Sequence, residues 1–296
     1  MFGQLSYEGI DRVGIHLGLR LDYVEKELHR DAVGLAGPTP TIDLSDDYFF
    51  VSPRIGFDYE LDDSSLIYLN TGLAFKPGGF SAFVDDPTLA PYDEERNWST
   101  ELGWKKAWMD DRVRTNVALF YNYIHDYQVE RSLVATDYAV LNADRAQSYG
   151  AEIEIMAELF DGFTVEGSLG LVKTEFDSFR DPLSGADLSG NRAPFVPEID
   201  ASLSGTYRHS SGMFARLELV YQGKTYFDDF NNSDFKEPGY TLLNAVVGYE
   251  SDNGFQFSVY GQNLTDQVYY QNISPDLRAG TVGAPTVVGV RAGYTF

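Results

Sequence analysis

Apolar and polar residues alternate with a period of two along most of the chain. In Val13–Tyr23 every odd position is apolar, whereas the even positions carry glycine, histidine, arginine and aspartate. The same alternation runs through Val113–Tyr123, with Ala118 and Phe120 as exceptions, and through Tyr149–Leu159. Successive side chains of a strand point to opposite faces, whereas a helix would need a period of about 3.6 residues. The pattern therefore predicts strands that each have one apolar face.

Thirteen strands are expected by this criterion, and several exceed the usual length of about five or six residues. They fall near residues 1–8, 12–28, 48–60, 64–77, 96–108, 112–131, 145–160, 163–178, 196–209, 212–228, 239–250, 254–264 and 285–296. The last of them alternates from Thr286 to Phe296 and ends on an aromatic residue. Long strands are expected where a sheet crosses a bilayer at a tilt and projects beyond it.

Short and long connections alternate between the expected strands. The short ones consist of turn residues and lie at 8–11, 61–63, 109–111, 161–162, 210–212 and 251–254. The long ones lie around 29–47, 78–95, 132–144, 179–195, 229–238 and 265–284. An up-and-down barrel with tight periplasmic turns and extended external loops produces this asymmetry. A β-sandwich has Greek-key crossings and a propeller has blade repeats, so neither is expected to alternate in this way.

The predicted fold class is therefore all-β, an antiparallel up-and-down transmembrane barrel. The longest uninterrupted apolar run is Val117–Tyr121, far short of the ~20 apolar residues of a membrane helix. A barrel strand needs only about 9–11 residues, of which every second one is apolar. The apolar face should meet outer-membrane lipid, and the polar face should line the lumen. Tyrosines near strand ends are expected to form an interfacial belt, among them Tyr23, Tyr121, Tyr123, Tyr207 and Tyr221.

Charge and composition narrow the class of partner. The 296 residues carry a net charge of −23 and include no cysteine. A strongly acidic chain is not expected to bind nucleic acid, because phosphate binding needs clustered cations, and thiolate metal sites and disulfides are excluded. The acid is concentrated in Asp43–Asp47, Asp85–Glu95 and Asp228–Asp234, which we interpret mainly as solvated loop surface. The last stretch also has the oxygen ligands that divalent cations prefer, but lacks calcium-loop spacing.

Catalytic and cofactor chemistry is not indicated, and the chain is not expected to be an enzyme. The four histidines, His16, His29, His125 and His209, are scattered and lack metal-site spacing. Glu152 and Glu154 lie side by side on one expected strand, whereas a glycosidase needs two carboxyls that face each other across the substrate. Lumen lining, or cross-strand pairing with arginine, is the better interpretation. No catalytic, cofactor-binding or metal-binding residue is assigned.

Several different short motifs follow one another along the chain, spaced like successive hairpins. They are Ser52-Pro53-Arg54-Ile55-Gly56, Phe75-Lys76-Pro77-Gly78-Gly79-Phe80, Glu101-Leu102-Gly103-Trp104-Lys105, Phe120-Tyr121, Gly150-Ala151-Glu152-Ile153-Glu154, Gly190-Asn191-Arg192 with Pro194 and Pro197, and Asn263-Leu264-Thr265-Asp266 with Tyr269-Tyr270. In order and spacing they resemble the C-terminal half of the barrel of TonB-dependent outer-membrane receptors. The end of the chain, Tyr294-Thr295-Phe296, resembles the terminal assembly signal of that family.

The resemblance implies a barrel of about 22 strands with an N-terminal plug inside. Counted back from Phe296, residues 1–296 would form a partial barrel domain, roughly strands 10 to 22. The plug, the coupling box that contacts the TonB complex and the first strands would be missing, and Phe2–Tyr7 already reads as a strand rather than as a secretory signal. Open strand edges are costly in lipid, so we expect a truncated product or a piece of a longer chain.

Transport is the function that the resemblance implies. The whole protein would be a Gram-negative outer-membrane receptor for energised uptake of a scarce nutrient such as a ferric siderophore, vitamin B12 or an oligosaccharide. The loops around 29–47, 78–95, 179–195 and 265–284 would carry ligand contacts, which we expect from aromatic or arginine side chains such as Tyr92, Phe195, Phe230, Arg180 and Arg192. The alternatives are a passive pore or adhesive barrel without a plug, and a soluble secreted β-protein.

Overall fold

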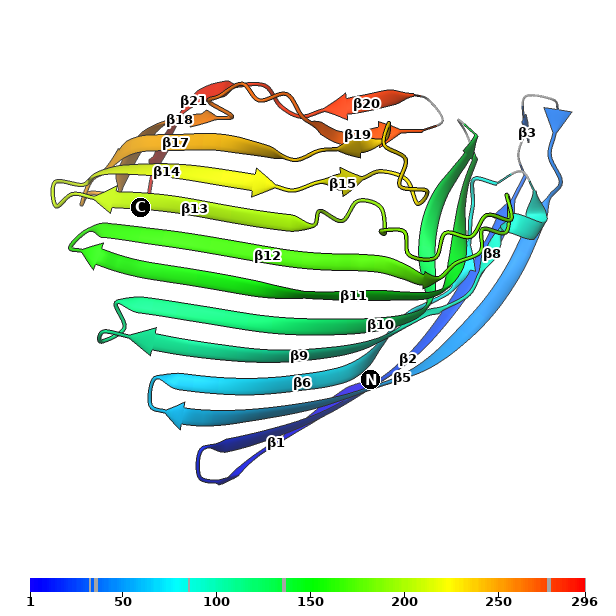
Figure 1. Ribbon diagram of the computed structural model, residues 1–296, viewed down its shortest axis with the longest axis horizontal. Helices are drawn as coiled ribbons and strands as arrows, with labels where there is room; N and C mark the ends of the chain where they lie inside the picture. Colours follow the sequence, from blue (N-terminus) through cyan, green and yellow to red (C-terminus); the bar gives the residue numbers. More distant parts are fainter. Residues whose placement is uncertain (32, 35–36, 85, 135–136, 276–277, 296) are drawn as a thin grey trace.

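A single antiparallel sheet of thirteen strands forms the body of the molecule in a computed structural model (Figure 1). The model describes residues 1–31, 33–34, 37–84, 86–134, 137–275 and 278–295. Each strand pairs only with its neighbours in the order β1-β2-β5-β6-β9-β10-β11-β12-β13-β14-β17-β18-β21, which follows the sequence. The topology is therefore up-and-down throughout, without a crossover.

The strands of the sheet are unusually long. Their bounds are β1 (Phe2–Ile10), β2 (Val13–Arg30), β5 (Ile42–Asp62), β6 (Ser65–Lys76), β9 (Glu95–Trp108), β10 (Val113–Val134), β11 (Asp137–Phe160), β12 (Phe163–Ser178), β13 (Ile199–Arg208), β14 (Met213–Gln222), β17 (Tyr240–Glu250), β18 (Phe255–Gln262) and β21 (Val287–Tyr294). Four two-stranded pairs lie in the long connections: β3 (Val33–Gly34) with β4 (Gly37–Pro38), β7 (Gly79–Phe80) with β8 (Pro91–Tyr92), β15 (Thr225–Tyr226) with β16 (Lys236–Glu237), and β19 (Tyr270–Ser274) with β20 (Ala279–Val282). A short 3₁₀ turn, η1 (Pro87–Leu89), completes the elements.

The number and order of strands expected from the pattern are confirmed, but two local expectations are wrong. Residues 132–144 were expected to form a loop, whereas β10 and β11 stay paired up to Val134 and Asp137. The pairing continues because Val129, Leu141 and Ala143 become buried there, away from water. The acidic stretch Asp43–Asp47 was assigned to a connection but belongs to β5, which begins at Ile42. Asp85 and Phe296 lie outside the described residues.

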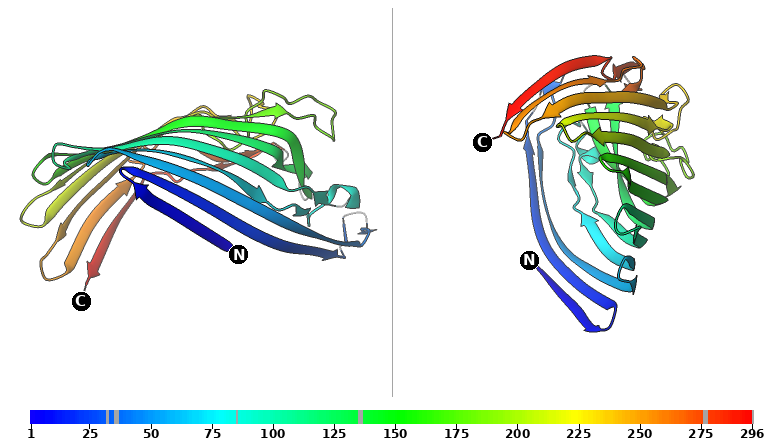
Figure 2. Two further views of the ribbon diagram at one scale, coloured as in Figure 1. Left: turned by 90° about the horizontal axis from the view of Figure 1, so that it is seen from below. Right: turned by 90° about the vertical axis from the view of Figure 1, so that its left-hand side faces the viewer.

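The sheet is curved and open, with its first and last strands apart (Figure 2). Within the described residues, β1 and β21 are each hydrogen-bonded to a neighbouring strand on one side only. The thirteen strands thus form part of a barrel wall that is not closed. No helix in the described part of the chain is long and apolar enough to cross a membrane.

The two faces of the sheet differ in chemistry and in exposure. In β14, Leu217 and Leu219 are 54% and 43% exposed, whereas Arg216 and Glu218 between and beside them are partly buried. Side chains on the inner side of a curved sheet crowd one another, so the polar set faces inward and the apolar set faces outward. This is the reverse of a soluble barrel and is the arrangement of a barrel in lipid.

The short connections are tight turns whose geometry demands particular residues. Gly162, between β11 and β12, has a φ of +78°, which favours glycine, and a Cβ there would lie 2.2 Å from the Arg208 carbonyl oxygen. Gly254, between β17 and β18, has a φ of +82° and would meet the Thr295 carbonyl oxygen at 2.2 Å. Each of these two turns therefore packs against the end of a neighbouring strand, β13 for Gly162 and β21 for Gly254, and glycine is needed for that approach.

Candidate functional site

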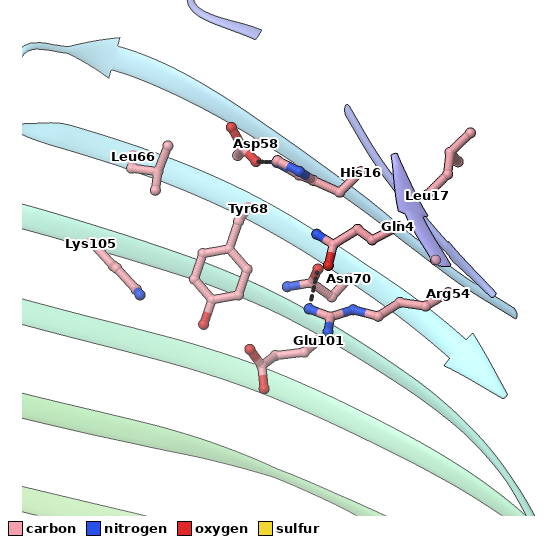
Figure 3. A pocket seen from close by; sticks show the side chains of 11 residues that line it. Gln4, His16, Leu17, Arg54, Asp58, Leu66, Tyr68, Asn70, Glu101 and Lys105 are labelled. Carbon is pink, nitrogen blue, oxygen red and sulfur yellow. Dashed lines mark hydrogen bonds and ion pairs between the residues drawn. The ribbon is translucent and has the colours of Figure 1, made fainter. Parts of the chain in front are cut away.

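The inner face of the sheet carries a polar depression over β1, β2, β5, β6 and β9 (Figure 3). It has a volume of about 460 Å³. His16 is central to one side of it, since its Nε2 lies 2.5 Å from Asp58 Oδ1 and its Nδ1 lies 3.0 Å from Ser6 Oγ. Arg54 donates to Asn70 Oδ1 at 3.5 Å, and Figure 3 shows Leu17 pointing away from the polar group. The depression is a surface for polar contacts within the lumen.

Carboxylates on the inner face pair across strands, as expected for lumen lining. Arg216 of β14 donates to Glu166 of β12 at 2.7 Å and to Glu218 on its own strand at 3.1 Å. The two glutamates weighed as a catalytic pair, Glu152 and Glu154, both lie on β11 and face the same way. Glu154 accepts a hydrogen bond from Asn116 of β10 at 3.1 Å. Glu154 therefore pairs with an amide, whereas the arginine pairing is found at Glu166.

Tryptophans mark the depth of the sheet in the membrane. All three tryptophans, Trp98, Trp104 and Trp108, lie on the outer face of β9. The ten steps from Trp98 to Trp108 span about 34 Å along a strand, or roughly 26 Å across a bilayer at a tilt of about 40°. This matches an apolar band of about 25 Å with aromatic residues at both edges. Of the predicted tyrosine belt, Tyr23 and Tyr121 are 65% and 44% exposed on the same face.

The hairpin of β10 and β11 extends beyond the neighbouring strands, and side chains near its tip bind the 77–94 connection. Gln128 is buried and donates through Nε2 to the Pro77 and Asp93 carbonyls, both at 3.0 Å. Asn142 donates to the Asp93 carbonyl at 3.1 Å and accepts from the Asp93 N–H at 2.9 Å. Gly78 completes the closure, because a Cβ there would lie 2.5 Å from the Tyr92 carbonyl oxygen. The Lys76-Pro77-Gly78-Gly79 motif thus has a structural explanation.

The same hairpin holds two further connections through Arg131. Its guanidinium contacts Asp181 of the 179–198 connection at 2.5 Å and Asp229 of the 223–239 connection. The side chains of Arg131, Asp181 and Asp229 are only 12%, 1% and 8% exposed. The guanidinium also lies over the rings of Phe179 and Phe230, at 5.9 and 5.3 Å from the ring centroids. We call these five residues the Arg131 cluster.

Hydrogen bonds join the 179–198 and 223–239 connections directly to each other. Asn191 donates to the Asp229 carbonyl at 3.0 Å. Asn231 accepts from the Arg192 N–H at 2.7 Å and donates to the Arg192 carbonyl at 2.9 Å. The Phe195 N–H donates to the Tyr226 carbonyl at 2.8 Å. The Gly190-Asn191-Arg192 motif therefore makes one unit of two connections.

Arginines expected to meet an anionic ligand are already engaged within these connections. Arg180 donates to the Gly185 carbonyl at 3.0 Å, and Arg192 pairs with Glu198 at 3.4 Å. The aromatic candidates differ, since Phe195 and Phe230 are 55% and 46% exposed. Tyr92 is half-buried in the 77–94 connection. The accessible members of this set of expected ligand residues are thus the two rings and Arg180, which is exposed despite its bond to Gly185.

The last long connection, 263–286, is organised by Asn263, which is 3% exposed. Its Nδ2 donates to the Gln267 and Ala284 carbonyls at 2.9 and 3.0 Å, and its Oδ1 accepts from the Gln267 N–H at 2.8 Å. Glu237 joins this connection to 223–239 by accepting from the Tyr270 N–H at 2.9 Å. The Asn263-Leu264-Thr265-Asp266 motif is therefore a loop clamp.

Metal binding gains no support from the expected acidic stretch. Asp228 accepts from the Asn232 N–H at 2.9 Å, and Asn231 is committed to Arg192, so these oxygens cap turns. Among the described residues, no three histidine, aspartate or glutamate side chains converge in a way that could hold a metal ion. His125 packs edge-on against Tyr123 with ring centroids 4.7 Å apart.

Asp181, a member of the Arg131 cluster, and Asp228, which lies beside it, have pKa values shifted in opposite directions. Burial alone would raise the pKa of Asp181, but hydrogen bonds from Ser184 and the Leu183 N–H, together with Arg131, hold it below its usual range. Burial raises the pKa of Asp228, and the nearby charge of Asp229 raises it further. The protein environment therefore favours the charge on Asp181 and disfavours the charge on Asp228.

Four residues that organise the external connections were not predicted as functional from the sequence: Gln128, Arg131, Asn142 and Asn263. Gln128, Arg131 and Asn142 lie in or next to the segment assigned to a loop, and their partners are 16 to 98 residues away. Asn263 was part of a quoted motif, but its partners could not be read from the motif.

Comparison with known proteins places this architecture. A family model for the TonB-dependent receptor-like β-barrel matches residues 1–264. The pesticin receptor of Yersinia pestis is 24% identical over 304 residues, covering 100% of this chain and 43% of the receptor. The ferric-pyoverdine M114 receptor PbuA of Pseudomonas sp. (strain M114) is 24% identical over 254 residues, covering 82% of this chain and 30% of the receptor.

Solved structures agree on the fold. The ferric yersiniabactin uptake receptor FyuA from Yersinia pestis superposes with a TM-score of 0.77 at 24% identity, over 98% of this chain and 43% of FyuA. The chain thus spans less than half the length of the relatives that it matches. The match of the family model over most of the chain, the up-and-down sheet and the outward apolar face lead to one conclusion: the chain belongs to the TonB-dependent receptor-like β-barrel family of the Gram-negative outer membrane.

Proposed function

We propose that this chain is the ligand-recognising barrel portion of a receptor that takes up a metal chelate of the siderophore type. The proposal rests on the ligands for which the related receptors are named. A pesticin receptor, ferric-pyoverdine receptors and a metal-pseudopaline receptor match 74–100% of the chain. These relatives favour a metal chelate over vitamin B12 or an oligosaccharide. The long connections would bind the ligand from outside, with Phe195 and Phe230 as accessible rings.

Residues 1–296 would act as one barrel domain in this proposal. The open edges at β1 and β21 would pair with further strands, and a plug would occupy the polar inner face. Energy would come from the TonB complex through that plug, and the outer face would contact membrane lipid. The chain's own role is ligand binding and passage, and no catalytic step is assigned to it.

The test is uptake of iron-55 from ferric siderophores by cells that express the protein from its natural gene. The host should lack its own siderophore receptors and should be prepared with and without TonB. The expected result is saturable uptake of at least one ferric siderophore that disappears without TonB. Uptake proportional to concentration and independent of TonB would contradict the proposal and support the passive pore. Absence of uptake for a panel covering catecholate, hydroxamate, phenolate and carboxylate chelates would also contradict it.

A further inference from the structure

A single arginine connects the hairpin of β10 and β11 to two external connections. Arg131 lies near the outer end of β10, and its Nη1 contacts Asp181 at 2.5 Å while its Nη2 contacts Asp229. Asp181 is 50 residues away in the chain and Asp229 is 98 residues away. Each terminal nitrogen of the guanidinium thus serves a different connection, which a lysine with one nitrogen cannot reproduce in the same geometry.

Because the cluster is buried, removing Arg131 alone would be costly. The side chains of Asp181 and Asp229 are 1% and 8% exposed, so each would be left as a buried charge without Arg131. Buried ion pairs contribute little net stability compared with apolar packing, but they can specify one arrangement over others. Arg131 Nε is buried and finds no hydrogen-bond partner among the described residues, which is a further cost of this placement. The cluster is therefore better suited to fixing an arrangement than to stabilising the fold.

Aromatic packing supports the same arrangement, because each of the two connections places a ring against the guanidinium. The ring of Phe179 lies in the first connection and that of Phe230 in the second, at 5.9 and 5.3 Å from Arg131. Phe179 is itself 1% exposed and belongs to a buried apolar cluster with Val129 of β10 and Leu188. Phe230 remains 46% exposed, so the Arg131 cluster reaches solvent through this ring.

The two connections that Arg131 contacts, 179–198 and 223–239, form one hydrogen-bonded unit. Asn191 and Asn231 hydrogen-bond the two connections to each other, and the same unit carries the exposed rings of Phe195 and Phe230. A change in the position of the unit would therefore move both rings together, relative to the barrel wall below.

We propose that Arg131 is the positioning residue of the external layer: it fixes the joined 179–198 and 223–239 connections against the hairpin of β10 and β11, and so sets where Phe195 and Phe230 stand. The link to ligand binding rests on the proposed uptake function, whereas the fixing of the two connections does not. Arg180, which contacts only its own turn, has no such role.

Hydrogen exchange tests the proposal without any ligand. The protein, expressed from its natural gene and purified in detergent, would be compared with R131Q, R131K and the control R180Q. R131Q should speed amide exchange at least about tenfold in both 183–192 and 228–235, because both connections lose their tie at once. R131K should leave one connection protected, and R180Q should change neither segment by more than about twofold. Amide exchange within the strands β12, β13 and β14 themselves should be unaffected.

The single variants D181N and D229N keep the test open if R131Q does not reach the membrane. D181N should loosen 183–192 more than 228–235, and D229N should show the reverse order. The proposal is overturned if R131Q leaves both segments within about twofold of the unmodified protein, or if R131K and R131Q behave alike. Equal acceleration in the connections and in β12–β14 would also overturn it, because that would indicate general destabilisation. A failure of iron uptake would leave each of these results unchanged.

Discussion

The membrane sheet and the external layer of this protein are stabilised in opposite ways. In the sheet, large apolar side chains such as Leu217 and Val247 are more than half exposed, and continuous backbone pairing joins neighbouring strands. In the external layer, which comprises the long connections and the outer strand ends, apolar residues such as Val84 and Phe179 are fully buried, although some rings remain exposed. Both buried apolar clusters of the described residues lie there, one around Phe176 and one around Ile42.

The contrast follows from the solvent that each region meets. Lipid satisfies apolar side chains but not backbone groups, so the sheet must pair every strand and can leave leucine outside. Water satisfies backbone groups but not apolar side chains, so the external layer must bury valine, leucine and phenylalanine. Its irregular backbone is then tied by side chains such as Gln128, Arg131 and Asn263. The two regions should therefore respond to different substitutions.

The largest effect is expected from a charge on the outer face of the sheet. Leu219 and Val220 are neighbours in β14 on opposite faces. Leu219→Lys should lower the free energy of unfolding by about 2–4 kcal/mol, whereas Val220→Lys should cost about 1 kcal/mol or less, because only the first places a charge in lipid. Urea unfolding of the natural-gene protein in lipid vesicles measures both. Equal costs for the two variants would contradict the assignment of faces.

A smaller effect is expected in the last external connection. Asn263→Ala removes a buried amide, leaves the Gln267 and Ala284 carbonyls without a donor, and places alanine at a φ of +47°. The opening free energy of residues 264–285, measured by hydrogen exchange, should fall by about 2–3 kcal/mol. Asn272→Ala, at an exposed position of β19, is the matched control and should stay within about 0.5 kcal/mol. A similar loss in both variants would argue against the clamp.

The 77–94 connection should be loosened somewhat less by loss of its tie. Gln128→Ala leaves the Pro77 and Asp93 carbonyls without the Nε2 donor, but Asn142 still contacts Asp93. Opening of residues 78–92 should become easier by about 1–2 kcal/mol, with no change in the unfolding midpoint of the sheet. A lower midpoint for the whole protein would show that the two regions are not energetically separate.

The smallest expected effect is a pH-dependent gain in the stability of the external layer around Asp228. The raised pKa of Asp228 means that its charged form is disfavoured in the folded external layer, so stability is lost as the pH rises through that pKa. Asp228→Asn should therefore protect residues 224–235 slightly at pH 7, and the gain should vanish at low pH. Solvent screening keeps the gain small. Opening free energies from hydrogen exchange, corrected for intrinsic rates, should show no gain for Asp234→Asn, whose carboxylate is exposed. A loss at pH 7 would contradict the prediction.

The same contrast explains how far the sequence could be interpreted. Alternation in Val13–Tyr23 predicted both the strand and its lipid face, because period two is a local property that lipid leaves undisturbed. Residues 132–144 at the hairpin tip were predicted as a loop, because burial in the external layer interrupts the alternation. Ties such as Arg131 to Asp229 join residues 98 positions apart, and no local pattern records them. The family resemblance implied that ligand contacts lie in the long connections, and this stays a prediction.

The orientation of the two regions is the central claim, and cysteine labelling tests it most directly. The chain has no cysteine, so single cysteines can be placed at Leu183 in the external layer and at Asp252 in the turn between β17 and β18. A membrane-impermeant maleimide applied to intact cells that express the natural-gene protein should label Leu183→Cys. It should label Asp252→Cys only after the outer membrane is permeabilised. Labelling of Asp252→Cys in intact cells, with Leu183→Cys protected, would contradict the account.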